Sequence, residues 1–390
     1  MKLCLMKRKI LYISGTRADY GLMKNCLLKI DNSPNLDLEI AVCGMHLMDE
    51  FGSSINEIKE DGFKINIIDV VFKKDDKFSM AEFIGEFIVN LSEKIKDIKP
   101  DIILILGDRA EMLGGAIVGT YLNIPVAHLH GGEISSTVDE YARHAITKLS
   151  NIHLAASELS KERIISMGEN PKDVFFVGAP GLDEVLEKNL ISSKIIAKKY
   201  DLNLSKPLII AVQHPVSLES DKSKEQILET LKVINNLKYQ TIMIYPNADA
   251  GGRAMIETIK KYKDENKMDF LKTFKNIEHD EFLSLMNIAD VMIGNSSSGI
   301  FEALYFNLPV INIGSRQDGR EQGDNVINTG YEASQIEKSI NKVMNDDFKD
   351  KIKYSKKPYG DGNASEKIVE ILSSVELNEE LLKKQLFFKK

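Results

Sequence analysis

Short apolar runs followed by glycine-led polar loops recur along the chain. The clearest run, residues 101–106 (DIILIL), is apolar on both faces, as expected of a buried strand in a parallel sheet. Residues 9–14 and 291–293 have the same character, and a polar loop leads from each into apolar residues at helical spacing. Strands that alternate with helices predict an α/β fold, whose ligands gather at the carboxyl ends of parallel strands.

One layout of this kind occurs twice. Residues 105–133 and 292–319 each contain a strand, a glycine-led loop, a helix, an Asn-x-Pro turn, a second strand and a polar loop. The match is closest between residues 121–126 (YLNIPV) and 305–310 (YFNLPV). The repeat predicts two similar Rossmann-like, doubly wound domains that face each other across a ligand cleft.

A Gly/Pro cluster at residues 178–181 marks the end of the first domain. We expect these parts in chain order: an N-terminal domain over 1–180, a linker over 181–206, a C-terminal domain over 207–360 and a helical end over 361–390. Within these parts the pattern predicts a strand over 63–71, a lysine-rich helix over 182–200 and a helix over 365–388.

Composition narrows the class of protein. Hydrophobic residues make up 43% and charged residues 28%, which is typical of a soluble globular protein. The formal net charge of −7 argues against a broad nucleic-acid-binding surface. The three cysteines, Cys4, Cys26 and Cys43, have neither metal-ligand spacing nor an even disulfide framework, which favours the cytoplasm. No apolar run approaches the ~18–20 residues needed to cross a bilayer, so we expect no membrane partner.

The second copy of the repeat carries a serine-rich loop, Asn295 to Gly299. Serine and asparagine accept the amides of a first helical turn, and those amides with the helix dipole form a site for an anion. An ordinary polar helix cap is the alternative, and the second copy of the pattern favours the ligand site. Arg316 follows the next strand and adds a guanidinium. These residues predict a nucleotide-diphosphate clamp.

The first copy carries candidate acids and bases. Asp108 follows the buried strand, where a carboxylate is well placed for chemistry, although a helix cap would also explain it. Polar groups accumulate further along at His130, Glu133 and Asp139, which favours shared acid–base and sugar-binding roles. Two histidines separated by one residue suggest a metal, but a third ligand is lacking, and we expect no metal. Arg17, after the first strand, is equally consistent with a phosphate contact and a solvated charge.

Seven motifs in one order resemble the UDP-N-acetylglucosamine 2-epimerase family, in particular its hydrolysing branch, which starts sialic and legionaminic acid synthesis. They are SGTRADYG, LGDRAEM, IPVAHLHGGE, VDEYARHAITKLS, QHPVSLE, PNADAGG and GNSSSGIFEALYFNLPVINIGSRQDGRE. The resemblance covers nearly the whole chain. It implies the GT-B fold, two Rossmann-like domains with a UDP-sugar in the cleft, and a final helix over 361–390 that crosses back to the first domain.

The resemblance also implies roles for individual residues. Asp108 and Asp139 match catalytic carboxylates, whereas His130 stands where many relatives have an acidic residue, so either His130 or Glu133 supplies that group. The residues that match nucleotide, phosphate or sugar contacts are Arg17, Arg109, His214, Asn247, Ser296, Ser297, Glu302 and Arg316. Among them, the serines imply amide contacts to the diphosphate and Glu302 an acceptor for the ribose hydroxyls.

The implied reaction releases UDP and N-acetylmannosamine from UDP-N-acetylglucosamine. A base removes the proton at carbon 2 while UDP leaves carbon 1, and water then adds to the resulting glycal with inversion at carbon 2. Because elimination and hydration are not redox steps, we expect no cofactor. A UDP- or GDP-diacetylbacillosamine substrate, a non-hydrolysing epimerase, a GT-B glycosyltransferase and a nucleotide-sugar sensor are the alternatives. We expect a homodimer or homotetramer.

Overall fold

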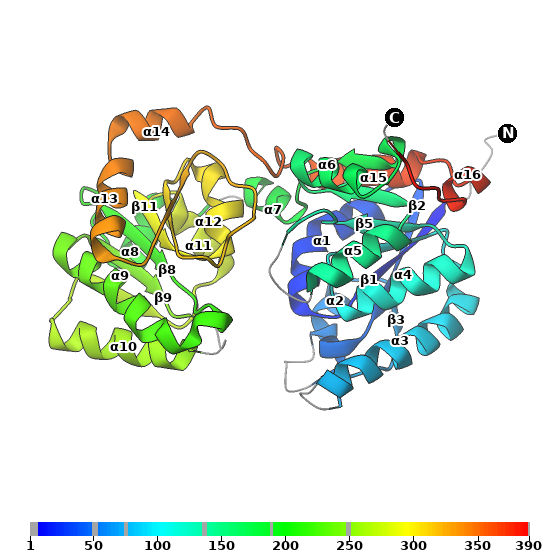
Figure 1. Cartoon of the computed structure of the whole chain (residues 1–390), viewed down its shortest axis with the longest axis horizontal. Helices are drawn as coiled ribbons and strands as arrows, with labels where there is room; N and C mark the ends of the chain where they lie inside the picture. The colour runs from blue at the N-terminus through cyan, green and yellow to red at the C-terminus, as the bar shows by residue number, and fades with distance from the viewer. Residues whose placement is uncertain are drawn as a thin grey trace. The chain divides into compact units, whose positions relative to one another are not determined.

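The computed structural model describes residues 7–48, 54–73, 77–134, 139–187, 190–246 and 251–388. The chain divides into two compact units, which are described separately (Figure 1). The first unit combines Met1–Glu184 with Tyr359–Lys390, and the second is Val185–Pro358. Residues 359–390 therefore belong with the N-terminal part of the chain. Within the described residues, no helix combines the length and apolar content that a bilayer crossing requires.

The first unit is built on a parallel sheet, seven-stranded over the described residues, in the order β3-β2-β1-β4-β5-β6-β7. Its strands are β1 (Arg8–Ser14), β2 (Leu36–Val42), β3 (Ile65–Ile67), β4 (Ile102–Leu106), β5 (Val126–Leu129), β6 (Ile152–Ala155) and β7 (Val174–Phe176). Its helices are α1 (Arg17–Asp31), η1 (Gly44–Leu47), α2 (Ile55–Glu60), α3 (Lys77–Ile98), α4 (Ala110–Leu122), α5 (Asp139–Leu149), α6 (Glu158–Ser166), η3 (Pro171–Asp173), α7 (Gly181–Glu187, which reaches into the second unit), α15 (Ala364–Ser374) and α16 (Glu379–Leu382).

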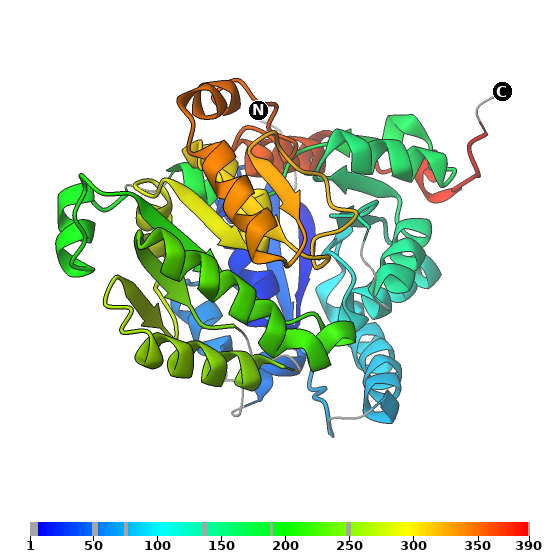
Figure 2. The same cartoon turned by 60° about the vertical axis from the view of Figure 1, so that its left-hand side comes forward.

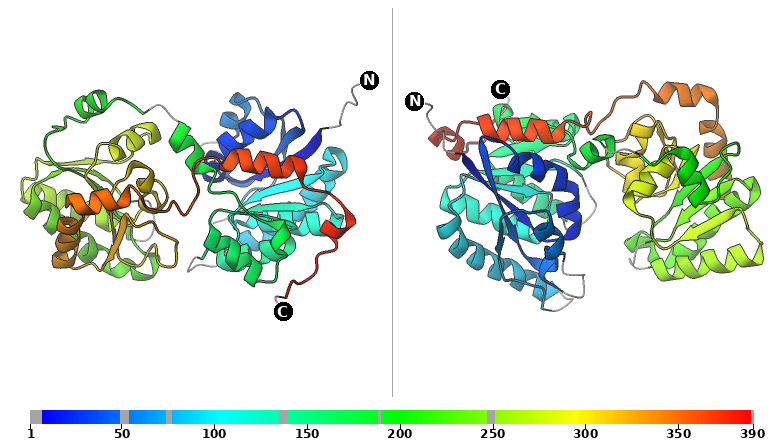
Figure 3. Two further views of the ribbon diagram at one scale, coloured as in Figure 1. Left: turned by 90° about the horizontal axis from the view of Figure 1, so that it is seen from above. Right: turned by 180° about the vertical axis from the view of Figure 1, so that it is seen from behind.

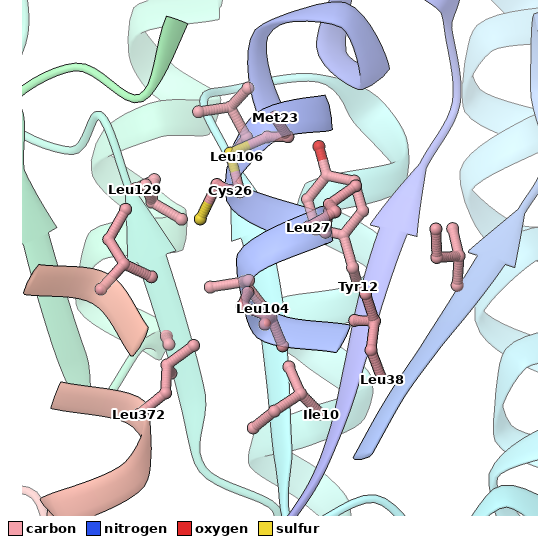
Figure 4. Close-up of a cluster of buried hydrophobic side chains, with 14 of the residues drawn as sticks. Ile10, Tyr12, Met23, Cys26, Leu27, Leu38, Leu104, Leu106, Leu129 and Leu372 are labelled. Carbon is pink, nitrogen blue, oxygen red and sulfur yellow. The ribbon is translucent and has the colours of Figure 1, made fainter. Parts of the chain in front are cut away.

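Alternating side chains of the strands supply two separate cores. On one face Ile10 and Tyr12 of β1 pack with α1 and α15, as the close-up of this cluster shows (Figure 4). On the other face Leu11 and Ile13 of the same strand pack with α3 and α4. Because both faces are covered, the strands are apolar at nearly every position, which explains the continuous apolar runs in the sequence.

The second unit repeats this plan with a parallel sheet, six-stranded over the described residues, in the order β10-β9-β8-β11-β12-β13. Its strands are β8 (Leu208–Val212), β9 (Gln240–Ile244), β10 (Leu271–Phe274), β11 (Val291–Gly294), β12 (Val310–Ile313) and β13 (Val326–Thr329). Its helices are α8 (Ser193–Lys199), η4 (Ser217–Lys222), α9 (Ser223–Leu237), α10 (Gly252–Glu265), α11 (His279–Met286), α12 (Ser297–Phe301), η5 (Ala303–Phe306), α13 (Ala333–Val343) and α14 (Asp346–Ile352). Figure 2 shows α9 and α13 in front of this sheet, where they share a core with β8, β11 and β12.

The predicted α/β repeat is confirmed in backbone geometry. Asn123 ends α4 with φ 55°, and Asn307 ends η5 with φ 50°. Asparagine tolerates this left-handed conformation better than most residues, so each copy turns directly through x-Pro into the next strand, β5 or β12. Two parallel-sheet α/β units in one chain confirm the predicted fold class.

Three local predictions are wrong. The strand expected over 63–71 is limited to β3, because the Val70 N–H turns back to the Ile68 carbonyl at 2.7 Å. The helix expected over 182–200 is interrupted, since residues 190–192 are not helical and Ser192 caps the start of α8. The helix expected over 365–388 ends at Ser374.

The C-terminal segment is held as a tail on the first unit. The Lys384 ammonium donates to the carbonyls of Thr147 at 3.0 Å and Ser150 at 2.5 Å, and the Phe387 N–H donates to the Gly168 carbonyl at 2.8 Å. The Phe387 N–H bond takes the place of a helical one, and the Lys384 side chain anchors the segment before it, so this amphipathic sequence is not a helix here. Figure 3 shows α15 beside α1 and the tail that follows it.

Candidate functional site

Several candidate residues, among them Asp108 and Ser296, follow strands at the point where chain order reverses in each sheet, and His130, Glu133 and Arg316 follow the next strand along. In the first unit this point lies between β1 and β4, and in the second between β8 and β11. In doubly wound sheets the loops at such a point diverge and leave room for a ligand at the carboxyl ends of the strands. The two polar clusters of the sequence are therefore placed where this fold binds ligands.

Arg143 of α5 joins the candidate catalytic segments of the first unit. Its buried guanidinium donates to the Asp108 carboxylate after β4 and, at 2.9 Å, to the Glu133 carbonyl oxygen after β5. Asp139 begins the same helix, one turn before Arg143. Arg143 lies in the VDEYARHAITKLS motif, and no role was predicted for it. Its bonds bring together Asp108, the Glu133 backbone and the helix that carries Asp139.

His130 and Glu133 form a pair. Nδ1 of His130 lies 2.9 Å from Oε1 of Glu133, and both side chains are about one-fifth exposed, at 18% and 17%. His130 lies beyond the end of β5 with a left-handed φ of 61°. The two side chains therefore lie close enough to serve together as candidate acid–base groups.

His128 has a structural role. It is fully buried in β5, and its Nε2 donates to the Gly107 carbonyl at 2.7 Å. Burial lowers the pKa of His128 to about 3, so the ring is neutral and fixes the turn before Asp108. Across the described residues, no three His, Cys, Asp or Glu side chains are grouped as metal ligands.

The two candidate arginines of the first unit differ in surroundings. Arg17, the first residue of α1, is 77% exposed, and its Nε lies 3.2 Å from Glu57. Arg109 precedes α4, and its Nε donates at 2.5 Å to the fully buried carboxylate of Glu111. The other carboxylate oxygen of Glu111 has no hydrogen-bond partner. Burial raises the pKa of Glu111, and Arg109 opposes that effect. Glu111, which orients Arg109, was not among the predicted site residues.

Gly15 makes the close approach of Glu111 possible. A Cβ at this position would lie 2.0 Å from Oε1 of Glu111. We therefore expect Gly15→Ala to displace the carboxylate and Arg109, to destabilise the protein by ~1–3 kcal/mol and to lower turnover. The control is Gly21→Ala in α1, where a Cβ meets no atom within 4 Å and alanine should stabilise by ~0.5–1 kcal/mol. Urea unfolding compares the two, and equal stability of both variants would contradict the prediction.

The candidate nucleotide residues of the second unit occupy loops after β8, β11 and β12. Ser296 caps α12 and accepts from the Ser298 N–H at 3.4 Å, and Ser297 is the first helical residue. Arg316 follows β12, and its Nη1 donates at 3.2 Å to the carbonyl of Asn295. Because α12 has only five residues, its dipole is small, so the predicted anion site would depend mainly on local amides and side chains.

Glu302 has the features expected of an acceptor for hydroxyl groups. Its side chain is 18% exposed, and Oε1 lies 3.3 Å from Nε2 of His279. Its Oε2 is buried without a hydrogen-bond partner, and leaving such an atom unsatisfied is costly. His279 was not among the predicted residues, since nothing in its local sequence distinguishes it. Asn247, the remaining candidate of this unit, lies outside the described residues.

Known proteins resemble this chain over most of its length. A family model described as UDP-N-acetylglucosamine 2-epimerase matches residues 28–373. The UDP-N,N'-diacetylbacillosamine 2-epimerase (hydrolyzing) of Legionella pneumophila is 43% identical, and the match covers 97% of this chain and 99% of that protein. The GDP/UDP-N,N'-diacetylbacillosamine 2-epimerase (hydrolyzing) of Campylobacter jejuni is 36% identical, covering 88% and 90%.

Solved structures share the fold. The UDP-GlcNAc 2-epimerase from Neisseria meningitidis, solved bound to UDP-GlcNAc, matches with a TM-score of 0.77 at 20% identity. The match covers 93% of this chain and 99% of that one. Each parallel-sheet unit of this chain is therefore one half of a GT-B-like architecture.

Proposed function

The chain belongs to the UDP-N-acetylglucosamine 2-epimerase family, and we propose that it is a hydrolysing epimerase of a nucleotide-linked 2-acetamido sugar. The observation that carries this proposal is the cluster around Arg143, which joins Asp108, the Glu133 backbone and α5 in one unit. Proton removal and return at carbon 2 require several acid–base groups near one sugar carbon. A glycosyltransferase has no need of such a set.

In our proposal the substrate is the nucleotide sugar UDP-N,N'-diacetylbacillosamine. From the sequence, UDP-N-acetylglucosamine was the first prediction and UDP-N,N'-diacetylbacillosamine an alternative. The Legionella pneumophila protein of that name supports the alternative, because it is 43% identical over nearly the full length of both chains. UDP-N-acetylglucosamine stays a prediction, and so does the choice of UDP over GDP.

The proposed reaction proceeds by elimination and hydration. Asp108 or Asp139 removes the proton at carbon 2 while the bond from carbon 1 to UDP breaks, which gives a glycal and UDP. Water then adds its oxygen to carbon 1, and a proton returns to carbon 2 on the opposite face. The pair of His130 and Glu133 supplies or accepts the second proton. Arg143 holds the Asp108 carboxylate in one orientation throughout.

The nucleotide part of the substrate is assigned to the remaining candidates. In the proposal His214, Ser296, Ser297 and Arg316 contact the diphosphate, and positive charge there stabilises the leaving group. Glu302 accepts the ribose hydroxyls through its unsatisfied oxygen. Arg17 and Arg109 are assigned to phosphate from the first unit, and Asn247 stays a predicted contact.

The test is an incubation of the purified protein in heavy water, followed by NMR. We use UDP-N,N'-diacetylbacillosamine, its GDP analogue and UDP-N-acetylglucosamine as separate substrates. The expected result is free UDP and a free 2-epimeric sugar with deuterium at carbon 2, formed fastest from the first substrate. An epimerised sugar still attached to UDP would indicate a non-hydrolysing epimerase. Release only with an added acceptor would indicate a glycosyltransferase, and binding without turnover a sensor.

A further inference from the structure

Asn295 stands where the central strand pairing of the second unit ends. It follows β11, is 2% exposed, and its N–H donates to the Val212 carbonyl at 3.0 Å. Gly294 permits this approach, because its φ is 125° and a Cβ there would lie 2.0 Å from the Val212 oxygen. The pairing of β8 with β11 therefore continues one residue beyond the strands.

The carboxamide of Asn295 bonds to both backbone groups of His214. Its Oδ1 accepts from the His214 N–H at 2.7 Å, and its Nδ2 donates to the His214 carbonyl at 2.9 Å. A carboxamide presents the same donor and acceptor as a peptide group, so the side chain takes the place of a further strand residue. Rotation of the His214 backbone would break two largely buried hydrogen bonds. These two bonds therefore fix the backbone direction of the loop that follows β8.

The backbone carbonyl of Asn295 binds a third loop. Arg316 Nη1 donates to it at 3.2 Å, and the buried Gln317 Nε2 donates at 2.8 Å. Two donors use both lone pairs of one carbonyl oxygen. Asn295 thus fixes the positions of His214 and Arg316 relative to the serine-rich loop that Asn295 begins.

The loop that carries Arg316 has a second anchor. Oε1 of Glu219 accepts from the Ser315 hydroxyl at 2.9 Å, and its Oε2 accepts from the Tyr331 hydroxyl at 3.0 Å. Loss of the Asn295 bonds would therefore shift the loop locally, since Glu219 still holds its other side. Substitution of the Asn295 side chain removes its two bonds to His214 and leaves the backbone carbonyl that binds Arg316. It should therefore change the position of His214 relative to Arg316 more than the fold.

We propose that Asn295 is a positioning residue that directs the His214 side chain and the Arg316 guanidinium at one diphosphate. This inference rests on the proposed function, which supplies the diphosphate. A fixed spacing between two groups that contact the same anion avoids the entropy loss of ordering them on binding. The variant that tests it is Asn295→Asp, which keeps the oxygen that accepts from His214 but replaces the donor with an oxygen facing the His214 carbonyl.

The matched control is Asn325→Asp. Asn325 is fully buried in the same unit, and its Nδ2 donates to the Leu308 carbonyl at 3.0 Å near the amino ends of β12 and β13. Both substitutions replace a buried amide donor with a carboxylate. Only Asn295 lies at the carboxyl ends of the strands, where the ligand is proposed to bind. For each variant we measure thermal unfolding and the affinities for UDP and for uridine, which lacks phosphate, at a temperature where all the proteins are folded.

We expect Asn295→Asp to weaken UDP binding by about tenfold or more, which corresponds to the loss of a buried hydrogen bond, and to leave uridine binding unchanged. The control should change neither affinity. Equal losses for UDP and uridine, or unchanged UDP binding, would overturn the inference. If Asn295→Asp does not fold, Asn295→Ser with Asn325→Ser answers the same question without a buried charge. An unaltered protein that neither binds UDP nor releases it would instead reject the proposed function.

Discussion

Asp108→Asn should lower turnover by ~10²–10⁴-fold, the usual effect of removing a general acid or base, and should leave UDP affinity nearly unchanged. Asparagine keeps an oxygen that accepts from Arg143, so the buried guanidinium retains a partner and the loop after β4 its shape. What is lost is the ability to accept a proton. Steady-state release of UDP from the nucleotide sugar, with calorimetric UDP binding, measures both effects.

Asp101→Asn is the control for this variant. Asp101 immediately precedes β4, at the opposite end of that strand, where its carboxylate accepts from the Lys9 N–H at 2.7 Å. We expect its turnover to match that of the unaltered protein. Full activity of Asp108→Asn would remove Asp108 from the mechanism, and equal losses in both variants would indicate a structural effect.

Asp139→Asn should also reduce turnover by ~10²–10⁴-fold without loss of UDP binding. Asp139 is exposed and begins α5, so the substitution removes a charge that stabilises the helix start by ~0.3–1 kcal/mol. That structural cost is too small to explain a loss of this size. Deuterium exchange at carbon 2, measured by NMR, shows whether proton removal or the later hydration step is impaired.

Glu158→Gln measures the structural cost by itself. Glu158 is the first residue of α6 in the same unit, and its side chain is 62% exposed. Glu158→Gln and Asp139→Asn each remove one negative charge from the first turn of a helix, so the two variants should have similar melting temperatures. Only Asp139→Asn should lose turnover. An Asp139→Asn protein as active as Glu158→Gln would exclude a catalytic role for Asp139.

Much of the fold follows from local pattern. The buried run that became β4 and the paired Asn-x-Pro turns at Asn123 and Asn307 predicted parallel strands and a repeated unit. These features are readable because a strand covered on both faces is apolar throughout, and because few residues adopt a left-handed turn without strain. The sheet orders and the division of the chain agree with that prediction.

The C-terminal segment of the chain was predicted less well. The segment after Ser374 has helical periodicity, yet Lys384 and Phe387 bond to carbonyls of the first unit instead. Periodicity reports which residues prefer burial, but Leu386, Phe387 and Phe388 are exposed in the tail, so its hydrogen bonds and not burial of these side chains set its path. The choice depends on acceptors far away in the sequence.

The chemical types of the site residues were also evident in the sequence. Asp108, His130, Glu133 and Asp139 follow strands in one half, and His214, Ser296 and Arg316 follow strands in the other. Their assignment as catalytic or nucleotide-binding groups stays a prediction, as do the cytoplasmic location and the homo-oligomeric state. Resemblance to a family supplied roles that residue types alone left open.

The sequence by itself determined that this chain forms two parallel α/β units and which polar groups follow their strands, because strand pattern and turn chemistry are local. The tertiary structure alone decided which groups hold the others in place. Arg143 joins Asp108 to Glu133, Glu111 orients Arg109, and Asn295 ties His214 to Arg316. Each of these links is a hydrogen bond, most of them between residues far apart in sequence, and such bonds form only after the chain has folded.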